Sequence, residues 1–180
     1  MKRPVCEFER LEANLAHLQS RSSALPSTAL LVTSLIQHLA RGFAQMLEGQ
    51  LRPFGLVEAE FKVLMMLFAE AQGFAHPSDL CVRTAQRPAN MSRICDALVA
   101  RELITRDACA EDRRRLVLRL TAKGEELVHR LLPMLLRPLE ALFAGLPAAE
   151  LDALAATLKR LGCRLETSSA LPEEPAEPAA

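Results

Sequence analysis

Apolar residues recur every three or four positions along three long stretches, and this spacing predicts three long helices. They cover residues 27–51, 121–143 and 148–165. In the first helix, Val32 and Ile36 widen the apolar stripe beyond what one neighbouring helix would cover. This breadth predicts burial in a helical dimer interface as well as in the core of the chain.

Shorter elements are predicted between these long helices. The spacing predicts a helix over 58–71, a short helix that begins near Pro77 with His76 or Ser78 as its cap, and a helix over 89–102. Two short helices joined by a tight turn are typical of a helix-turn-helix. Alternating side chains then predict two strands, over residues 103–107 and 116–120. We therefore predict a mainly α fold with a small β-hairpin, in which a winged helix-turn-helix lies between helices.

Charge is distributed unevenly along a chain whose formal net charge is zero. Residues 83–119 hold nine arginines against five acidic residues, which gives this window a charge of +4. Every basic residue in the window is arginine, whose planar guanidinium suits phosphates and guanine edges. A solvated face of salt bridges is the alternative, but the helix-turn-helix and the hairpin favour nucleic acid as the partner.

Four segments resemble the MarR family of winged helix-turn-helix transcriptional regulators, over roughly residues 27–165. They read "SDLCVRT", "MSRICDALVARELITR", "EDRRRLVLRLTAKGEEL" and "LPAAELDALAATLKRL". The resemblance implies a homodimer whose terminal helices interlock and hold two winged helices one turn apart on double-stranded DNA, over a pseudopalindromic site. One departure is Val57, which precedes the helix over 58–71. The family commonly has a Thr or Ser at this position, and the absence of the hydroxyl weakens the helix cap by about 1 kcal/mol.

The resemblance also implies a division of the chain into a DNA-binding lobe and a helical dimerisation domain. We expect an N-terminal arm or short helix at 1–26, dimerisation helices at 27–57 and 121–165, the winged helix-turn-helix at 58–120, and a disordered Pro/Ala/Glu-rich tail at 166–180.

The helix over 89–102 is the predicted recognition helix, which would enter the major groove with its N-terminus first. Asn90, Ser92 and Arg93 lie at its exposed start and are predicted to reach bases and phosphates. Ser78 and Arg87 are weaker candidates for phosphate contacts. The alternative is that these are ordinary surface residues.

The predicted wing is the tip of the hairpin. Asp112 and Arg114 match the paired acid and arginine of the family, which implies that Arg114 inserts into the minor groove while Asp112 holds the tip. Arg113 and Arg115 are expected to clamp phosphates or to remain solvated charges, and Arg106 is expected to buttress the wing.

An effector site is predicted on the first long helix. Ser34, His38, Arg41 and Gln45 form one narrow polar line beside its apolar face. Members of the family often bind small aromatic carboxylates or phenols here, so the resemblance implies a benzoate-, phenol- or nicotinate-like effector. His38 and Arg41 could pair with its carboxylate. The apolar walls would come from Phe54, Phe61, Met65 and Phe68. A solvent-facing stripe or a dimer contact is the alternative.

The cysteines and histidines predict neither a disulfide framework nor a metal site. The five cysteines are an odd set without a C-x-x-C pair, and the four histidines have no i, i+4 partner. We expect no cofactor. A redox-sensing regulator is an alternative: Cys109, beside the wing arginines, is its best candidate, whereas Cys95 is expected to be inert core.

Other classes of protein find less support in the sequence. The chain has no glycine-rich phosphate loop, no nucleophile elbow and no H-E-x-x-H, so we do not expect an enzyme. A helical protein-interaction adaptor would explain the long apolar helices but not the arginine-rich wing. Neither a signal peptide nor an apolar run of about 20 residues is present, which predicts a cytoplasmic protein without a membrane partner.

Overall fold

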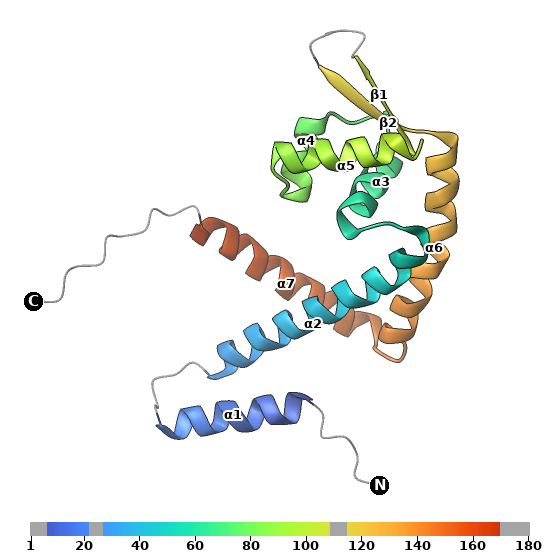
Figure 1. Cartoon of the computed structure of the whole chain (residues 1–180). Helices are drawn as coiled ribbons and strands as arrows, with labels where there is room; N and C mark the ends of the chain where they lie inside the picture. The colour runs from blue at the N-terminus through green and yellow to red at the C-terminus, as the bar shows by residue number, and fades with distance from the viewer. Residues whose placement is uncertain (1–6, 22–26, 109–114, 170–180) are drawn as a thin grey trace, which may run out of the picture. The chain divides into compact units, whose positions relative to one another are not determined.

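Helices form most of the structure, which is a computed structural model that describes residues 7–21, 27–108 and 115–169 (Figure 1). The elements are α1 (Glu7–Arg21), α2 (Ser27–Leu51), the 3-10 helix η1 (Arg52–Phe54), α3 (Glu58–Ala69), α4 (Pro77–Thr84), α5 (Pro88–Ala100), β1 (Ile104–Ala108), β2 (Leu116–Leu120), α6 (Ala122–Phe143) and α7 (Ala148–Ser169). The chain separates into two compact units, Met1–Leu135 and Leu136–Ala180. The predicted mainly α fold with one hairpin is confirmed.

Most predicted boundaries agree with the structure, and the differences have local causes. The helix predicted over 58–71 ends at Ala69, because Glu70 is extended and a turn with Gly73 at φ +70° follows. The last helix continues beyond 165 to Ser169, into the segment where the sequence predicts the tail. Residues 52–54, which the sequence leaves as a break, form η1 with Pro53 in its first turn.

One leucine from each of five elements forms the centre of the core of the first unit. These side chains are completely buried and belong in turn to α3, α4, α5, β2 and α6: Leu64, Leu80, Leu98, Leu118 and Leu131. Burial of each such side chain is worth about 1.5–3 kcal/mol. The core therefore joins both helices of the helix-turn-helix to the base of the hairpin and to α6.

A third chain segment extends the two-stranded sheet on its second edge. β1 pairs with β2 in antiparallel register from Ile104↔Leu120 to Ala108↔Leu116. On the other edge of β2, Ala75 donates its N–H to the carbonyl of Leu118 (3.1 Å) and accepts the N–H of Leu118 in return (2.9 Å). Both edges of β2 are thus occupied, although the sequence predicts only the hairpin.

The motif "LTAKG" at the start of α6 fastens this helix to the end of the recognition helix. The hydroxyl of Thr121 accepts the N–H of Gly124 (3.0 Å) and donates to the carbonyl of Glu102 (2.7 Å), so it caps α6. The backbone of Gly124 lies so close to the carbonyl of Leu103 that an added Cβ would stand 2.1 Å from this oxygen. The glycine is therefore required by a close approach of two backbones.

Within the described residues, no single helix is both long and apolar enough to cross a membrane, although α6 and α7 pass that test when they are taken together as a bent pair.

We predict that Gly124→Ala lowers the free energy of unfolding by about 1–3 kcal/mol, because the new methyl group must push the carbonyl of Leu103 away. Urea denaturation followed by circular dichroism measures this change. Gly42→Ala is the matched control: nothing lies within 4 Å of an added Cβ at this position of α2, so we expect stabilisation of roughly 0.5–1 kcal/mol. Equal effects of the two substitutions would contradict the proposed role of the close approach.

Candidate DNA-binding surface and neighbouring cavity

The recognition helix α5 divides into a buried face and an exposed face. Its buried side chains are Met91, Ile94, Cys95 and Leu98. The helical period then turns the side chains at the start of α5 outward, and the predicted DNA-contacting residues Asn90, Ser92 and Arg93 are all exposed. Arg93 thus lies on the face opposite the buried side chains, and Asn90 and Ser92 lie on the two flanks of that face.

The two weaker candidates for phosphate contacts lie on different elements, Arg87 in the turn before α5 and Ser78 in α4. Arg87 occupies the N-cap position of α5, is exposed, and makes no side-chain hydrogen bond to the first turn. The amide of Asn90 donates to the side-chain oxygen of Gln86 (2.5 Å), which holds Asn90 at the helix start. Ser78 is exposed in the first turn of α4, where its hydroxyl donates to Asp79 (3.2 Å).

Arg106 connects the hairpin to the recognition helix. It projects from β1 and forms an ion pair with Asp96 of α5 at 3.0 Å. Arg106 also interacts with the neighbouring thiol of Cys95: burial raises the pKa of this thiol, and Arg106 opposes the rise. Because Cys95 is fully buried with a raised pKa, it is held as the protonated thiol and is a poor candidate for a reactive thiolate.

The predicted wing tip lies mostly outside the described residues. This applies to Asp112, Arg113 and Arg114, and also to Cys109. Arg115 is described: it is exposed and directly precedes β2. The sequence prediction for the wing tip therefore continues as a proposal below.

A cavity of about 900 Å³ lies where α2 meets η1 and the start of α3. Its lining is Arg41, Ala44, Gln45, Glu48, Arg52, Gly55, Leu56, Val57 and Glu58. It contains two members of the predicted polar line, Arg41 and Gln45. Arg52 also reaches it, a residue that the sequence analysis did not single out. The lining thus has two guanidinium groups, two carboxylates from Glu48 and Glu58, and an apolar wall.

The other predicted effector residues lie elsewhere in the same unit. Ser34 and His38 are on the half of α2 before Arg41, and the His38 ring packs edge-on against Phe8 with centroids 4.9 Å apart. Arg130 lies over the Phe54 ring at 5.7 Å, and the Phe68 ring packs edge-on against His129 at 5.1 Å. Phe61 and Met65 are half-buried against the core. Of the eight residues predicted for the effector site, only Arg41 and Gln45 line this cavity.

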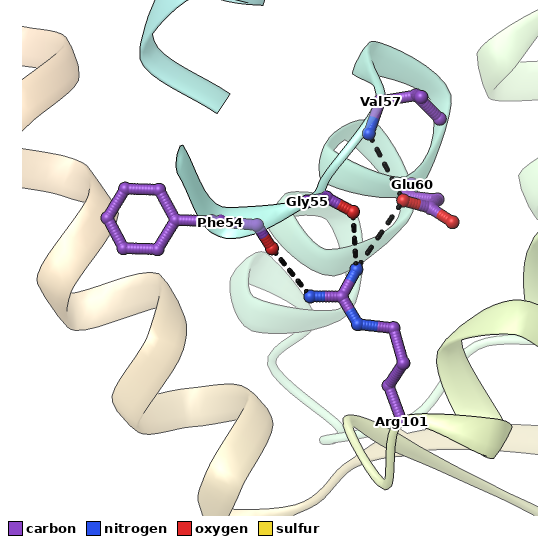
Figure 2. A network of polar contacts seen from close by, with 5 residues as sticks. All are labelled: Phe54, Gly55, Val57, Glu60 and Arg101. Carbon is purple, nitrogen blue, oxygen red and sulfur yellow. Dashed lines mark hydrogen bonds and ion pairs between the residues drawn. The ribbon is translucent and has the colours of Figure 1, made fainter. Parts of the chain in front are cut away.

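The guanidinium of Arg101 fastens the turn beside this cavity to the end of α5, as Figure 2 shows. It donates to the carbonyl of Phe54 (2.7 Å) and to the carbonyl of Gly55 (2.8 Å), and it lies 3.8 Å from the carboxylate of Glu60. Glu60 in turn accepts the N–H of Val57 at 3.1 Å. Val57 has no hydroxyl, so only this half of the usual reciprocal cap exists at the start of α3.

No pattern in the sequence marks Arg101 as a structural residue. Its partners lie 46 and 47 positions earlier in the chain, so no local spacing marks the contact. Arg101 was counted only as one of the charges around the recognition helix, and its half-buried position at the C-cap of α5 distinguishes it from the exposed arginines.

A helix-turn-helix followed by a hairpin and a further helix, with exposed polar residues at the start of the second helix, defines a winged helix-turn-helix DNA-binding protein. The chain belongs to the MarR family of transcriptional regulators. The model of this family matches residues 54–115. The chain is also 30% identical over 159 residues to the transcriptional repressor MprA of Escherichia coli (strain K12), covering 88% of this chain and 90% of MprA.

Solved structures of related regulators agree with this assignment. AbsC, a MarR family transcriptional regulator from Streptomyces coelicolor, matches with a TM-score of 0.72 and 27% identity, over 79% of this chain and 97% of AbsC. BpsR of Bordetella bronchiseptica, whose DNA binding is regulated by 6-hydroxynicotinic acid, matches with a TM-score of 0.62 and 26% identity, over 73% of this chain and 98% of BpsR. The chain is thus a DNA-binding transcriptional regulator and not an enzyme.

We predict that Arg101→Ala lowers the free energy of unfolding by about 1.5–3 kcal/mol, because two carbonyls lose charge-assisted hydrogen bonds and Glu60 loses its cation. Arg101→Lys should fall between this variant and the wild type, since an ammonium lacks the planar fork that bridges two carbonyls. Thermal denaturation of both proteins measures the effect.

The control for this prediction is Arg83→Ala, which removes an exposed ion pair with Glu70 and should cost at most about 1 kcal/mol. If Arg101→Ala lowered the free energy of unfolding no more than this control, the hydrogen bonds from Arg101 to Phe54 and Gly55 would not stabilise the fold.

Proposed function

We propose that this protein is a homodimeric repressor that acts in the cytoplasm, binds a pseudopalindromic operator in double-stranded DNA, and is released by a small aromatic acid. The observation that carries the proposal is the exposed polar start of α5, directly beside a hairpin within an arginine-rich stretch of the chain. The kinship with the repressor MprA supports repression as the direction of control.

In this proposal, α5 enters the major groove. Asn90 and Arg93 would read base edges, because an amide and a guanidinium offer paired hydrogen bonds to adenine and guanine. Ser92 would contact a base or a phosphate, and Arg87 and Ser78 would contact phosphates. The buried face of α5 supports this orientation, since it leaves only the opposite face for DNA.

The wing supplies a second contact in this proposal. Arg114 would enter the minor groove, where narrow A/T stretches concentrate negative potential, and Asp112 would hold the tip. Arg113 and Arg115 would neutralise phosphates. Arg106 would steady the hairpin, and its ion pair with Asp96 supports that role because it joins β1 to the recognition helix.

Exposed apolar side chains support dimerisation. On α7, Leu154, Leu158, Leu161 and Leu165 are between 40% and 70% exposed at helical spacing. On α2, Ile36 and Leu39 are 40% and 49% exposed. Exposed apolar stripes of this kind mark interaction sites. The proposed occupant is the equivalent helix of a second copy, which would place the two recognition helices one DNA turn apart.

The cavity beside η1 is the proposed effector site. Its volume of about 900 Å³ lies within the range of small-molecule sites, roughly 300–1,000 Å³. Arg41 and Arg52 would pair with a carboxylate, and Leu56 and Val57 would contact the ring. Regulation of BpsR by 6-hydroxynicotinic acid supports a nicotinate-like effector. Ser34 and His38 would extend the site along α2, and the predicted apolar residues would contribute to it from η1 and α3.

The turn beside the cavity would couple the effector to DNA. Gly55 lines the cavity, and its carbonyl accepts a hydrogen bond from Arg101 at the end of α5. A ligand that shifts this turn would therefore act on the recognition helix through one side chain. The ligand would favour the conformations of the DNA-binding lobe that fit the operator poorly.

We predict that Arg114→Ala weakens operator binding about tenfold or more without changing the dimer, because the minor-groove contact is lost. Fluorescence anisotropy on the upstream region of the protein's own gene gives the affinity, and light scattering gives the mass. Arg164→Ala, on α7, is the control and should bind as the wild type does. An unchanged affinity in the Arg114 variant would contradict the wing assignment.

We also predict saturable heat when the purified protein is titrated calorimetrically with at least one of benzoate, phenol, nicotinate and 6-hydroxynicotinate. Arg41→Gln and Arg52→Gln should each weaken the binding of a carboxylate about tenfold, the loss expected of a charge-assisted hydrogen bond. Arg137→Gln, outside the cavity lining, should leave it unchanged. The absence of saturable heat with every compound would reject the effector site.

A further inference from the structure

The first helix of the helix-turn-helix begins without a side-chain cap. Helices usually start at Ser, Thr, Asp or Asn, whose oxygen accepts an N–H of the first turn. Here the N-cap position of α4 is His76, which is extended (φ −87°, ψ 144°) and makes no such hydrogen bond within the described structure. Ser78, the other cap that the sequence predicts, donates its hydroxyl to Asp79 instead.

The imidazole of His76 contacts the stem of the wing. Its Nδ1 lies 2.7 Å from the carbonyl of Leu116, a residue 40 positions later in the chain. A carbonyl only accepts, so Nδ1 carries the hydrogen and donates it. Leu116 is the first residue of β2, and it is the last residue of that strand paired with β1 before the wing tip.

The pattern of the sheet explains why this carbonyl needs a side-chain donor. Leu118 turns both its N–H and its C=O to Ala75, on the edge of β2 away from β1. Alternate residues of an antiparallel strand point to the same edge, so the carbonyl of Leu116 faces that edge too. The segment that pairs there ends at Ala75, because the chain turns into α4 at His76. His76 therefore donates from its ring where a longer strand would donate from its backbone.

A second contact ties the same segment to β2. The guanidinium of Arg119 lies 4.8 Å from the centre of the Phe74 ring, and its Nη1 is 3.5 Å from the carbonyl of Gly73. The Phe74 ring packs edge-on against the His76 ring with centroids 5.8 Å apart. The residues before α4 thus hold β2 through Leu116, Leu118 and Arg119, and His76 is the contact nearest to the wing tip.

We infer that His76 is a positioning residue for DNA binding, acting through the carbonyl of Leu116 to fix the direction in which the wing leaves the helix-turn-helix. The inference rests on the proposed contact between the wing and DNA. A hairpin without this hydrogen bond would sample more directions, of which only one fits DNA. The affinity of the protein for DNA would then fall in proportion to the fraction of time that the wing spends in that direction.

Two substitutions separate this role from the role of a helix cap. His76→Ser and His76→Asn both restore a side-chain cap to α4, so both proteins should melt at or above the wild-type temperature. They differ in the donor: the amide nitrogen of Asn lies the same number of bonds from Cα as Nδ1, whereas the Ser hydroxyl is one bond shorter. We expect His76→Ser to weaken operator binding about five- to tenfold. We expect His76→Asn to stay within about threefold of the wild type.

The salt dependence of operator binding supplies a readout that stability alone would not change. If the wing is misdirected in His76→Ser, the slope of log K against log[salt] should decrease in magnitude by about one phosphate contact. Anisotropy titrations at four salt concentrations measure this slope. Wild-type affinity and slope in His76→Ser would overturn the inference, and so would equal weakening in the Ser and Asn variants.

Arg114→Ala distinguishes a failure of this inference from a failure of the proposed function. If Arg114→Ala has no effect on affinity, the wing does not engage DNA, and the proposed function fails together with the inference. If Arg114→Ala weakens binding and His76→Ser does not, only the role of His76 fails. If both weaken binding, we expect the double variant to lose less than the product of the two losses, because both act through the wing.

Discussion

The burial of one face of α5 is the constraint on which the rest of the structure depends. Met91, Ile94, Cys95 and Leu98 fix the rotation of this helix about its axis, since any other rotation would expose several of them to water. Truncation of one of these buried side chains costs about 2–5 kcal/mol of stability. A single polar contact on the opposite face contributes less, about 0.5–1.5 kcal/mol. The apolar core therefore determines which side of α5 can meet DNA, and the exposed residues determine what it recognises.

Polar contacts connect α5 to two neighbouring segments outside this apolar core. Arg101 ties the end of α5 to the turn beside the cavity, and the ion pair between Arg106 and Asp96 ties its middle to the hairpin. The first contact joins segments 46 positions apart and the second joins two successive elements, and each can transmit a displacement from one element to the other. The recognition helix is thus connected to both places that the proposed function uses, the effector cavity and the wing.

The sequence predicted the elements well because their signals are local. The apolar spacing places α2 at its observed bounds and α5 within two residues, Pro77 places the start of α4, and alternation places β2 at its observed bounds. The exposed start of α5 could be predicted in the same way. The pairing of Ala75 with Leu118 and the contacts of Arg101 and His76 could not, since their partners lie about 40 residues away and leave no periodic pattern. Likewise, the polar line on α2 indicated Arg41 but not Arg52, which reaches the cavity only because η1 follows α2.

The start of α4 shows that a side chain at the N-cap position can stabilise the helix or contact the hairpin, and that His76 makes only the second contact. A Ser at position 76 would gain about 1 kcal/mol from capping and would leave the carbonyl of Leu116 without its donor. Restricting the wing from about ten equally populated directions to one is worth about 1.4 kcal/mol in DNA affinity, by the relation between population and apparent affinity. The two terms are of similar size, but they act on different equilibria, because the cap stabilises folding and the tie to Leu116 favours binding. Since the buried leucines already stabilise the helix-turn-helix, α4 forms without this cap, and the side chain at position 76 contacts the hairpin instead.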